Sequence, residues 1–529
     1  MNVAQVLINS VKKFHSKPAV IFRDETISFL ELYDNVFKLA NGLIKLGIKK
    51  SDKVAVYLPN CPEYVYSYLA LFSLGATVVP LDYMLTPDEL VSCLSHCQAK
   101  VLIAKEKSAV SLSDLKNRVA NLGEIIILGS ASAGSRNFQD VLASGRPLPP
   151  QNIKIEDTDP ALIMYTSGTT GSPKGILLNY RHLNGSPKAM EHFVDLTDKD
   201  VKLSALPLSH SAGLVYTQNC ICYGITLILM ERFQPLEFLR NIQKYKVTCF
   251  HLVPSMYYAL LNLKEFESFD LSSLRWVVVF GAPSDPQSLR RFQQYCPHAH
   301  FLNGWGLTET CPPNTVIPLG SKNIESVGKP APWVEVKIFG EDDEELPKGG
   351  VGEVVIRGWV VMEGYYNDPQ ATSEVLRGGW FHTGDLGRFD EEGFLYIVGR
   401  KKDMIKVSGE IVYSFEVENV LLKHPAIQEA AVVGIPDKLR GEIVKAFVVL
   451  KQEAGSGGSR TATTEDIRLF CREHLAHFKV PHNVEIRESL PKTPSGKIQK
   501  EKLKSPERLP AGRQKARENG LGYQNTRKI

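Results

Sequence analysis

The sequence feature that most constrains the fold is a loop rich in glycine and hydroxyl side chains that directly follows a short apolar run. Residues 161–165 read Ala-Leu-Ile-Met-Tyr, and a run of this kind predicts a buried β-strand. Residues 166–175 then supply Gly168 and Gly171, the four hydroxyl side chains of Thr166, Ser167, Thr169 and Thr170, and the cation Lys174. Because oxyanions are stabilised by convergent N–H and O–H donors beside a cation, the loop predicts a polyphosphate site. For this stretch alone, a flexible solvated turn is the alternative interpretation.

The position of the lysine distinguishes this loop from a Walker A motif. A Walker A loop ends in Gly-Lys-Ser/Thr, where a helix begins. Here Lys174 follows a proline and precedes Gly175. The loop is therefore a phosphate-binding candidate of a different kind.

Short apolar runs and helical segments alternate along the chain before this loop. Such alternation predicts an α/β architecture with parallel sheets. Ser28 and Glu31 form a capping box that opens a helix, and Gly47 marks the end of that helix. The other predicted elements are strands at 54–58, 76–80 and 100–104 and helices that begin at Pro62 and after Thr86.

The loop at 165–175 is expected to open a second run of the same kind. In that run, residues 275–280 form a strand that ends at Gly281, and ligands of open α/β sheets bind near the carboxyl ends of strands. Cys220 and Cys222 alternate as neighbours on a strand would.

The second half of the chain changes character twice. Short strands with glycine-rich turns at 333–339 and 352–358 predict a β-rich subdomain. After Arg400, strands at 429–434 and 444–450 and helices at 416–422 and 465–475 predict a further small α+β domain. A chain of 529 residues is too long for one compact core. We therefore expect a large α/β domain over 1–400, made of two α/β subdomains with parallel-rich sheets plus the β-rich subdomain, a small mobile domain over 401–505, and a basic disordered tail over 506–529.

The charge distribution excludes a basic binding face. The formal net charge is +4, and residues 504–529 hold seven Lys or Arg against two Glu, so the rest of the chain is close to neutral. A nucleic-acid partner is not expected. No apolar run is long enough to span a bilayer, and the N-terminus lacks the apolar core of a signal peptide. Nine cysteines without a CxxC pair favour free thiols in a reducing compartment, so we expect a cytoplasmic protein.

Four further motifs follow the loop in a fixed order. They are Gly-Trp-Gly-Leu-Thr-Glu at 304–309, His-Thr-Gly-Asp at 382–385, Gly-Arg-Lys-Lys-Asp at 399–403 and Pro-Lys-Thr-Pro-Ser-Gly-Lys at 491–497. With the loop, they resemble the adenylate-forming (ANL) superfamily, which comprises acyl-CoA synthetases, peptide-synthetase adenylation domains and firefly-type luciferases. The resemblance extends from about residue 15 to about residue 503, nearly the whole chain.

The resemblance implies an ATP site with Mg²⁺. Glu309 would hold Mg²⁺ against the phosphates, with Thr308 as a phosphate donor, and a hard cation of this kind prefers oxygen ligands. The family usually has Tyr where this chain has Trp305; an indole can stack on adenine, and a core aromatic is the alternative. The residues matching pyrophosphate-binding positions are Thr166, Ser167, Gly168, Thr169, Thr170 and Lys174, and those matching adenine-lining positions are Gly281, Ala282, Asn303, Gly304 and Trp305.

The remaining motif residues are assigned by the same resemblance. Asp385 would accept hydrogen bonds from the ribose hydroxyls, although an Asp after Gly is more often a turn residue, and Arg400 would also contact the ribose. Lys497 would bridge the carboxylate and the α-phosphate, where a bare Ser-Gly-Lys turn would suggest a surface loop. His210 would flank the acyl carbonyl, with a core histidine as the alternative. The small domain would rotate about the hinge residue Lys402, with Lys406 as an adenylate contact and Ser408 and Gly409 at the coenzyme A contact.

These assignments imply a two-step acid–thiol ligase that uses ATP, Mg²⁺ and coenzyme A. Residues 208–216 contain no acid to hold an α-ammonium, which disfavours amino acids. A medium- or long-chain fatty acid is the first expectation and an aromatic acid such as a cinnamate or benzoate the second. The alternatives are an enzyme that loads a carrier protein and a non-catalytic nucleotide sensor or scaffold. Ile411-Val-Tyr-Ser-Phe415 departs from the family's usual Asn-x-Tyr-Pro-x, which bears on the thioester-forming face.

Overall fold

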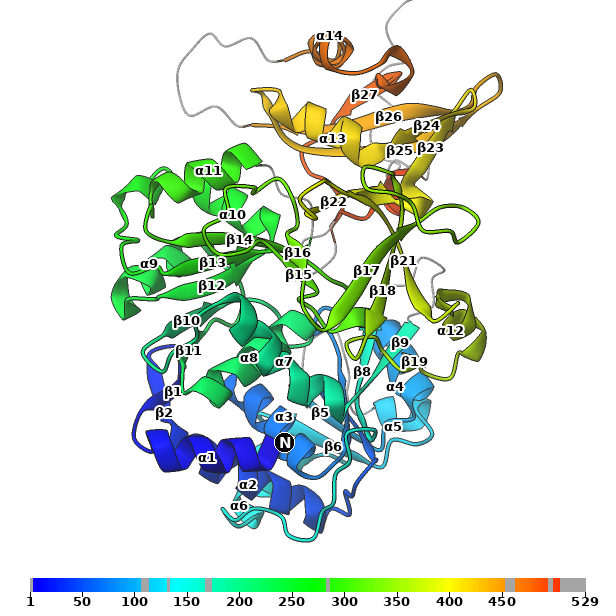
Figure 1. Ribbon diagram of the computed structural model, residues 1–529. Coiled ribbons are helices and arrows are strands. Elements are labelled where there is room, and N and C mark those ends of the chain that lie inside the picture. The colour runs from blue at the N-terminus through cyan, green and yellow to red at the C-terminus, as the bar shows by residue number, and fades with distance from the viewer. Residues whose placement is uncertain are drawn as a thin grey trace, which may run out of the picture. The chain divides into compact units, whose positions relative to one another are not determined.

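The computed structural model describes residues 3–105, 114–130, 134–166, 174–281, 286–451, 462–492 and 498–504. The chain divides into two compact units, the first ending at Lys402 and the second beginning at Asp403. Each unit is built around its own β-sheets (Figure 1). In the part of the chain that the structure describes, no helix is both long and apolar enough to cross a membrane.

The first unit contains an eight-stranded sheet with the order β19-β9-β8-β4-β3-β5-β6-β7. The strands from β8 to β7 pair in parallel, whereas β9 and β19 are added antiparallel at one edge. Its strands are β3 (Lys53–Tyr57), β4 (Thr77–Pro80), β5 (Val101–Lys105), β6 (Glu124–Leu128), β7 (Arg136–Asn137), β8 (Pro160–Thr166), β9 (Lys174–Asn179) and β19 (Gly364–Tyr365).

The helices of this first run begin where their caps predict. Ser28 and Glu31 exchange hydrogen bonds at the start of α2 (Phe29–Lys45), and Thr86 and Glu89 do the same for α4 (Pro87–Cys97). Each box satisfies backbone donors that a helix N-terminus leaves without intrahelical partners. The other helices of this region are α1 (Val3–Phe14), α3 (Pro62–Ser73), α5 (Leu115–Arg118) and α6 (Phe138–Ser144).

A nine-stranded sheet with the order β16-β15-β14-β13-β12-β10-β11-β1-β2 follows. Its centre is parallel, and the N-terminal strand β1 joins it beside β11. The strands are β1 (Pro18–Phe22), β2 (Glu25–Ser28), β10 (Val201–Ser204), β11 (Thr226–Leu229), β12 (Cys249–Leu252), β13 (Trp276–Val279), β14 (His300–Trp305), β15 (Thr315–Val316) and β16 (Lys329–Pro330), and the helices are α7 (Tyr180–Phe193), α8 (Ser211–Tyr223), α9 (Pro235–Tyr245), α10 (Pro254–Leu261) and α11 (Pro286–Gln294).

Alternation along the central strands of this sheet separates two faces. Leu203, Phe250 and Val277 pack against apolar side chains of α9, α10 and α11. Cys249 and Trp276 belong instead to the larger core that includes α8. Figure 1 shows α9 and α11 beside β12 to β14. The face toward α8 also carries buried polar side chains.

Two expectations about this region are wrong. The loop that begins after Thr166 does not open the second run; it joins the antiparallel pair β8 and β9, which completes the first sheet, and the second sheet resumes only at β10. Cys220 and Cys222 lie in helix α8 and not on a strand. This helix is buried continuously from Gly213 to Ile221, so its sequence lacks the polar face that reveals a helix. All nine cysteines are free.

The β-rich part of the first unit is an antiparallel sheet, as expected. Its strands are β17 (Val334–Phe339), β18 (Gly352–Gly358), β20 (Leu376–Arg377), β21 (Trp380–Phe389) and β22 (Leu395–Arg400), with α12 (Pro369–Val375) beside them. Val336, Val354 and Ile356 belong to the same core as the first sheet and α8, so the three sheets of this unit share apolar packing.

The second unit is α+β. A five-stranded sheet has its own core, to which Val417, Val432 and Ile467 contribute. Its elements are β23 (Met404–Val407), β24 (Glu410–Tyr413), α13 (Ser414–Lys423), β25 (Ile427–Asp437), β26 (Gly441–Leu450), α14 (Thr464–His474), β27 (Asn483–Ile486) and α15 (Lys500–Lys504).

Candidate active site

Three of the predicted nucleotide residues meet at one buried carboxylate. Asp385 on β21 is the register partner of Arg400 at the end of β22, and Arg400 Nε lies 2.9 Å from Asp385 Oδ1. Trp305, the last residue of β14, donates its indole N–H to Asp385 Oδ2 over 2.9 Å. Oδ2 therefore has a fixed donor and Oδ1 has a cation beside it, and the remaining lone pairs of both oxygens stay available to a ligand.

The adenine-lining candidates gather at the carboxyl edge of the second sheet. Asn303 on β14 is the register partner of the last residue of β13, and Gly281 follows β13 closely. Gly281 has φ +89°, a conformation that favours glycine. A Cβ on Gly304 would lie 2.9 Å from the Thr315 carbonyl oxygen, so the backbone at this position permits no side chain without rearrangement. Asn303 donates to the Ser326 carbonyl, which holds its amide in place.

The phosphate and metal candidates meet through a tyrosine that the motif reasoning did not assign. Tyr365 on β19 donates its hydroxyl to Glu309 Oε1 over 3.3 Å. Lys174 on β9 places its ammonium 4.8 Å from the centroid of the Tyr365 ring. Burial, with the neighbouring Glu309 charge, raises the pKa of Tyr365, so the hydroxyl is a donor at neutral pH. Strand β19 pairs with β9, and this long-range pairing has no local sequence signal.

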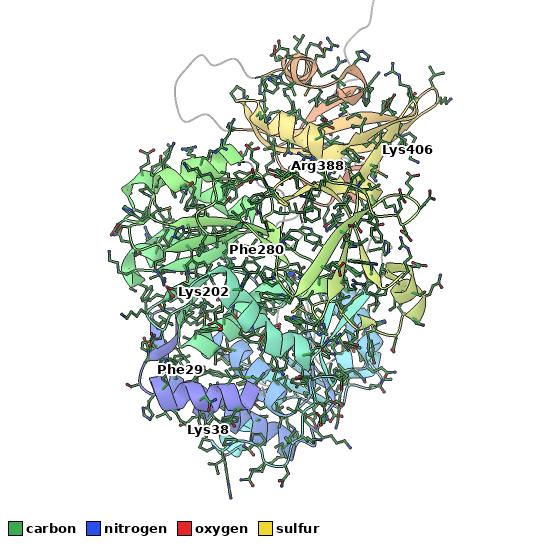
Figure 2. All side chains as sticks on the ribbon, viewed as in Figure 1. Phe29, Lys38, Lys202, Phe280, Arg388 and Lys406 are labelled. Atoms are coloured by element: carbon green, nitrogen blue, oxygen red, sulfur yellow. The ribbon has the colours of Figure 1, made fainter. Side chains whose placement is uncertain are left out.

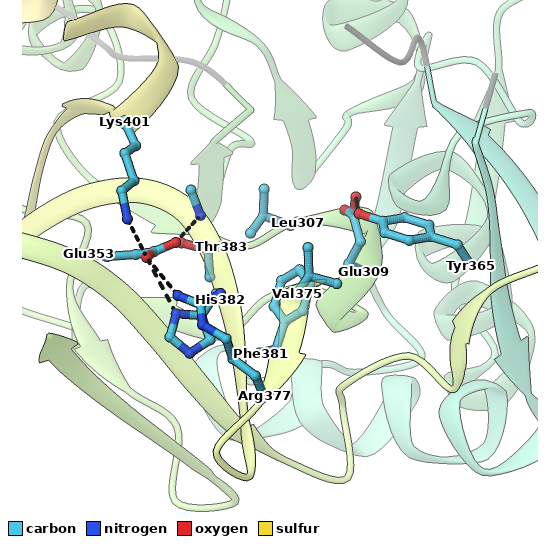
Figure 3. Close-up of a pocket in the computed structure, with 11 residues that line it drawn as sticks. Leu307, Glu309, Glu353, Tyr365, Val375, Arg377, Phe381, His382, Thr383 and Lys401 are labelled. Atoms are coloured by element: carbon cyan, nitrogen blue, oxygen red, sulfur yellow. Dashed lines mark hydrogen bonds and ion pairs between the residues drawn. The ribbon is translucent and has the colours of Figure 1, made fainter. Parts of the chain in front are cut away.

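A cavity of about 310 Å³ lies between Glu309 and the turn that precedes Asp385 (Figure 3). Glu353 on β18 faces this cavity and accepts from the Gly384 N–H over 3.0 Å, with His382 Nδ1 and Lys401 Nζ each 3.3 Å away. Burial alone would raise the pKa of Glu353, but these three donors outweigh it and lower the pKa. Glu353 therefore anchors the 382–384 turn and, through it, the backbone that carries Asp385.

His210 lies at the N-terminus of α8, as the N-cap residue. Its Nε2 is 3.6 Å from Asp82 Oδ2, too long for a hydrogen bond, and this buried nitrogen has no hydrogen-bond partner among the described residues. It is therefore available to a ligand. Asp82 is far away in the sequence, and no motif could have placed it beside His210.

The other candidates lie on the first unit, on the second unit or outside the described residues. Lys402 ends the first unit. Lys406 on β23 is exposed, and Ser408 and Gly409 form the turn to β24 with φ of +52° and +91°. Thr166 ends β8 and Thr308 begins the short 3₁₀ turn 308–310 that contains Glu309. Ser167, Gly168, Thr169, Thr170, Ala282 and Lys497 lie outside the described residues.

The described residues supply chemical groups of the kind that a nucleotide and a divalent cation need. The groups present are a buried carboxylate for hydroxyl donors, an aromatic indole beside it, a lysine, and two carboxylates, Glu309 and Glu353, at a cavity. No cluster of three or more His, Cys, Asp or Glu side chains that could hold a metal occurs among the described residues. Glu309 fits Mg²⁺, because this ion keeps several waters, binds through one or two carboxylates and takes its other ligands from substrate phosphates.

Comparison with known proteins supplies further evidence on the family to which the chain belongs. The AMP-binding enzyme family matches residues 7–366, and the AMP-binding enzyme C-terminal domain matches residues 416–497. A long-chain-fatty-acid–CoA ligase of Bacillus subtilis (strain 168) is 34% identical over 94% of this chain and 93% of its own length. A feruloyl-CoA synthase of Amycolatopsis sp is 35% identical over 90% of this chain and 92% of its own. The structure of the anthranilate CoA ligase AuaEII in complex with anthranoyl-AMP has a TM-score of 0.88 and 27% identity, covering 95% of this chain and 96% of that chain.

The fold, the order of the motifs and these matches all indicate the same family. The two family matches together span most of the chain, and the curated relatives align over nearly their full lengths. The chain therefore belongs to the AMP-binding enzyme family, in the acyl-CoA synthetase branch of the adenylate-forming superfamily.

Proposed function

We propose that this protein is an ATP-dependent acyl-CoA ligase that works in two steps with Mg²⁺. In the first step a carboxylate oxygen of the acid attacks the α-phosphorus of ATP, the bond to pyrophosphate breaks, and acyl-AMP forms. In the second step the thiol of coenzyme A loses its proton and its sulfur attacks the acyl carbon; the carbon–oxygen bond breaks and AMP leaves. The observation that carries this proposal is Asp385, a buried carboxylate beside Trp305 and Arg400 that lies in one of the five ordered motifs.

The proposed roles follow the chemistry of each group. Asp385 and Arg400 hold the ribose, and Trp305 stacks on the base while its N–H keeps the Asp385 carboxylate oriented. Lys174 and Thr308 bind phosphate oxygens, and Glu309 is the proposed Mg²⁺ ligand, oriented by Tyr365. When bound, Mg²⁺ neutralises charge on the phosphates.

We propose that the small domain presents different residues in the two steps, because one arrangement of the site cannot offer both the adenylation lysine and the coenzyme A contact. Lys497 acts during adenylate formation, and the turn at Ser408 and Gly409 faces coenzyme A during thioester formation. We propose rotation about Lys402 to exchange the two faces. The domain limits 1–400 and 401–505 belong to this proposal, as does a basic tail at 506–529.

For the acid, we propose a medium- or long-chain fatty acid first and an aryl acid second. Both kinds of substrate occur in the names of the relatives, a long-chain-fatty-acid–CoA ligase and a feruloyl-CoA synthase. The apolar side chains beside α8 and the absence of an acid from residues 208–216 support an acid without an α-ammonium group.

The test is pyrophosphate release with ATP and Mg²⁺ over a panel of fatty, aryl and amino acids, with and without coenzyme A. Release stimulated by one acid class and by coenzyme A is the expected result. Release of about one equivalent that stalls with or without coenzyme A would instead indicate a carrier-protein acceptor. Lys497→Ala should lose adenylate formation while still converting preformed acyl-adenylate to acyl-CoA. Adenylate formation at the native rate by this variant would contradict the role of Lys497.

A further inference from the structure

A group of polar side chains is buried inside the first unit without hydrogen-bond partners. Lys202 on β10 is 1% exposed, and His251 on β12 and Trp276 on β13 are each 3% exposed. Among the described residues, none supplies a hydrogen bond to Lys202 Nζ, to either ring nitrogen of His251 or to Trp276 Nε1. Buried polar groups normally have partners, so several such groups in one place require an explanation.

The sheet register brings these side chains together on one face. Lys202 is the register partner of Cys249, and Cys249 is the partner of Trp276. His251 lies two residues beyond Cys249 and so points to the same face. That face packs against α8 and not against α9 to α11. The residues Lys202, Tyr216, His251 and Trp276 are called the distal cluster below.

Tyr216 of α8 covers the cluster. Its ring stacks on His251 with centroids 3.5 Å apart, and Lys202 Nζ lies 4.3 Å from its centroid and 5.7 Å from that of Trp276. Aromatic faces attract the ammonium but offer it no hydrogen-bond acceptor.

Asp200, two residues before Lys202 in the chain, is already paired with other donors. Asp200 uses Oδ1 to accept from Arg275 over 2.6 Å and from Thr248 over 2.7 Å, and Oδ2 to accept from the Thr197 N–H. Burial lowers the pKa of the Lys202 amine, with Asp200 opposing this only in part. Burial, with the Lys202 charge, also lowers the pKa of His251. The cluster thus presents Lys202 Nζ and Trp276 Nε1 as donors without partners, and a neutral His251 supplies one N–H and one acceptor nitrogen.

The cluster leads toward the proposed reaction site. The ring centroids of Tyr216 and His251 each lie 5.8 Å from the ring centroid of Phe280, and Phe280 immediately precedes Gly281. Tyr216 also lies on the helix that begins after His210. Lys202 and Phe280 are labelled in Figure 2, within the part of the first unit that holds the second sheet. Helix α8 therefore links His210, at its N-terminus, to Tyr216 of the distal cluster.

We infer that the distal cluster selects an acid that carries a second oxygen acceptor at the end remote from the activated carboxyl group, and that Lys202 donates to this oxygen. This inference rests on the proposed function and narrows its acid class. The acceptor is a hydroxyl, carbonyl or carboxylate oxygen on a chain or ring whose middle is apolar. Such a group supplies the partner that the lysine lacks, whereas a terminal methyl group would leave the amine unpaired.

The experiment compares matched acids on the wild type and on Lys202→Met. Each pair has the same skeleton and differs at the far end: a methyl group against a hydroxyl, ketone or carboxylate on a chain, and an unsubstituted against a hydroxylated ring for aryl acids. The ratio of kcat/KM within each pair is the readout. The matched control is Lys199→Met, which changes an exposed lysine just before the same strand.

The wild type is expected to prefer the acceptor-bearing member of at least one pair by tenfold or more. Lys202→Met should lose that preference, and Lys199→Met should keep it. Equal use of both members by the wild type, or an unchanged preference in Lys202→Met, overturns the inference. The wild-type ratio decides even if the variant does not fold.

Calorimetric binding of the free acids without ATP separates this inference from the proposed function. Should the wild type activate no acid, the proposed function fails. Binding of an acceptor-bearing acid to the wild type but not to Lys202→Met would then still support the distal cluster. Absence of binding by every acid in the panel would overturn both.

Discussion

Replacing Asp385 with asparagine tests the nucleotide site most directly. The Asp385 side chain is 7% exposed; its Oδ2 accepts from Trp305 Nε1 over 2.9 Å, and its Oδ1 forms an ion pair with Arg400, whose Nε lies 2.9 Å away. An amide has one acceptor oxygen, so one of these donors would face an NH₂ group. The substitution therefore changes the hydrogen-bond pattern although it preserves the shape.

The expected magnitude follows from the kind of bond that is lost. A hydrogen bond to a charged group contributes about 1.5–3 kcal/mol. Loss of one such bond between the carboxylate and a ribose hydroxyl corresponds to a decrease of about 10- to 150-fold in kcat/KM for ATP. The partial misorientation of the remaining oxygen acts in the same direction.

The assay is acid-dependent pyrophosphate release with ATP, 2′-deoxy-ATP and 3′-deoxy-ATP. The wild type should use the deoxy nucleotides less well than ATP, and Asp385→Asn should lose most of this discrimination. Asp342→Asn, in an exposed turn between β17 and β18, is the matched control and should behave as the wild type. An equal loss with all three nucleotides would refute the ribose contact, because it would show that Asp385 acts on the fold and not on the hydroxyls.

Two other substitutions test the second unit and the metal site. Lys500 Nζ lies 2.7 Å from the buried Glu418, so Lys500→Met should destabilise this unit by about 3–5 kcal/mol at neutral pH. Burial raises the pKa of Glu418, so the carboxyl group becomes protonated as the pH falls toward the pKa that Glu418 has in the unfolded chain, and the stability difference between variant and wild type should shrink. Hydrogen exchange of the Val432 amide, which donates to Glu418, measures this difference. A stability difference that does not depend on pH would contradict this reasoning. Glu309→Gln keeps an acceptor for Tyr365 but removes the charge, so the Mg²⁺ concentration for half-maximal adenylation should rise by roughly tenfold, about 1.4 kcal/mol. Chelation of Mg²⁺ should abolish wild-type adenylation, and unchanged Mg²⁺ dependence in the variant would exclude Glu309 as the ligand.

Local sequence patterns were sufficient for much of the first half of the fold. The caps at Ser28 and Thr86 act over one helical turn, and both helices begin at the predicted positions. The predicted strand at 54–58 is β3 (Lys53–Tyr57), because a short apolar run between turns leaves few other choices. The chain order of the motifs identified the family, since several motifs in sequence are far more specific than one.

The sequence could not reveal which strands pair or which helix is hidden. Nothing near residue 174 shows that β9 returns antiparallel to the first sheet, because pairing depends on partners far away in the chain. Helix α8 is buried on all sides, so the periodicity that identifies a helix is absent from its sequence. The alternation of Cys220 and Cys222 therefore predicted a strand where the structure has a helix.

The same division applies to the candidate site. The sequence by itself determined the chemical groups: Asp385, Arg400, Trp305 and Glu309 were named from their motifs, with each role still a proposal. Only the tertiary structure decided which groups touch. In the structure the Trp305 N–H donates to Asp385, and the Lys202 ammonium lies over the Tyr216 ring without a hydrogen-bond acceptor. The physical reason is that motif chemistry is encoded within a few residues, whereas contact and burial arise when strands distant in the sequence become neighbours in one sheet.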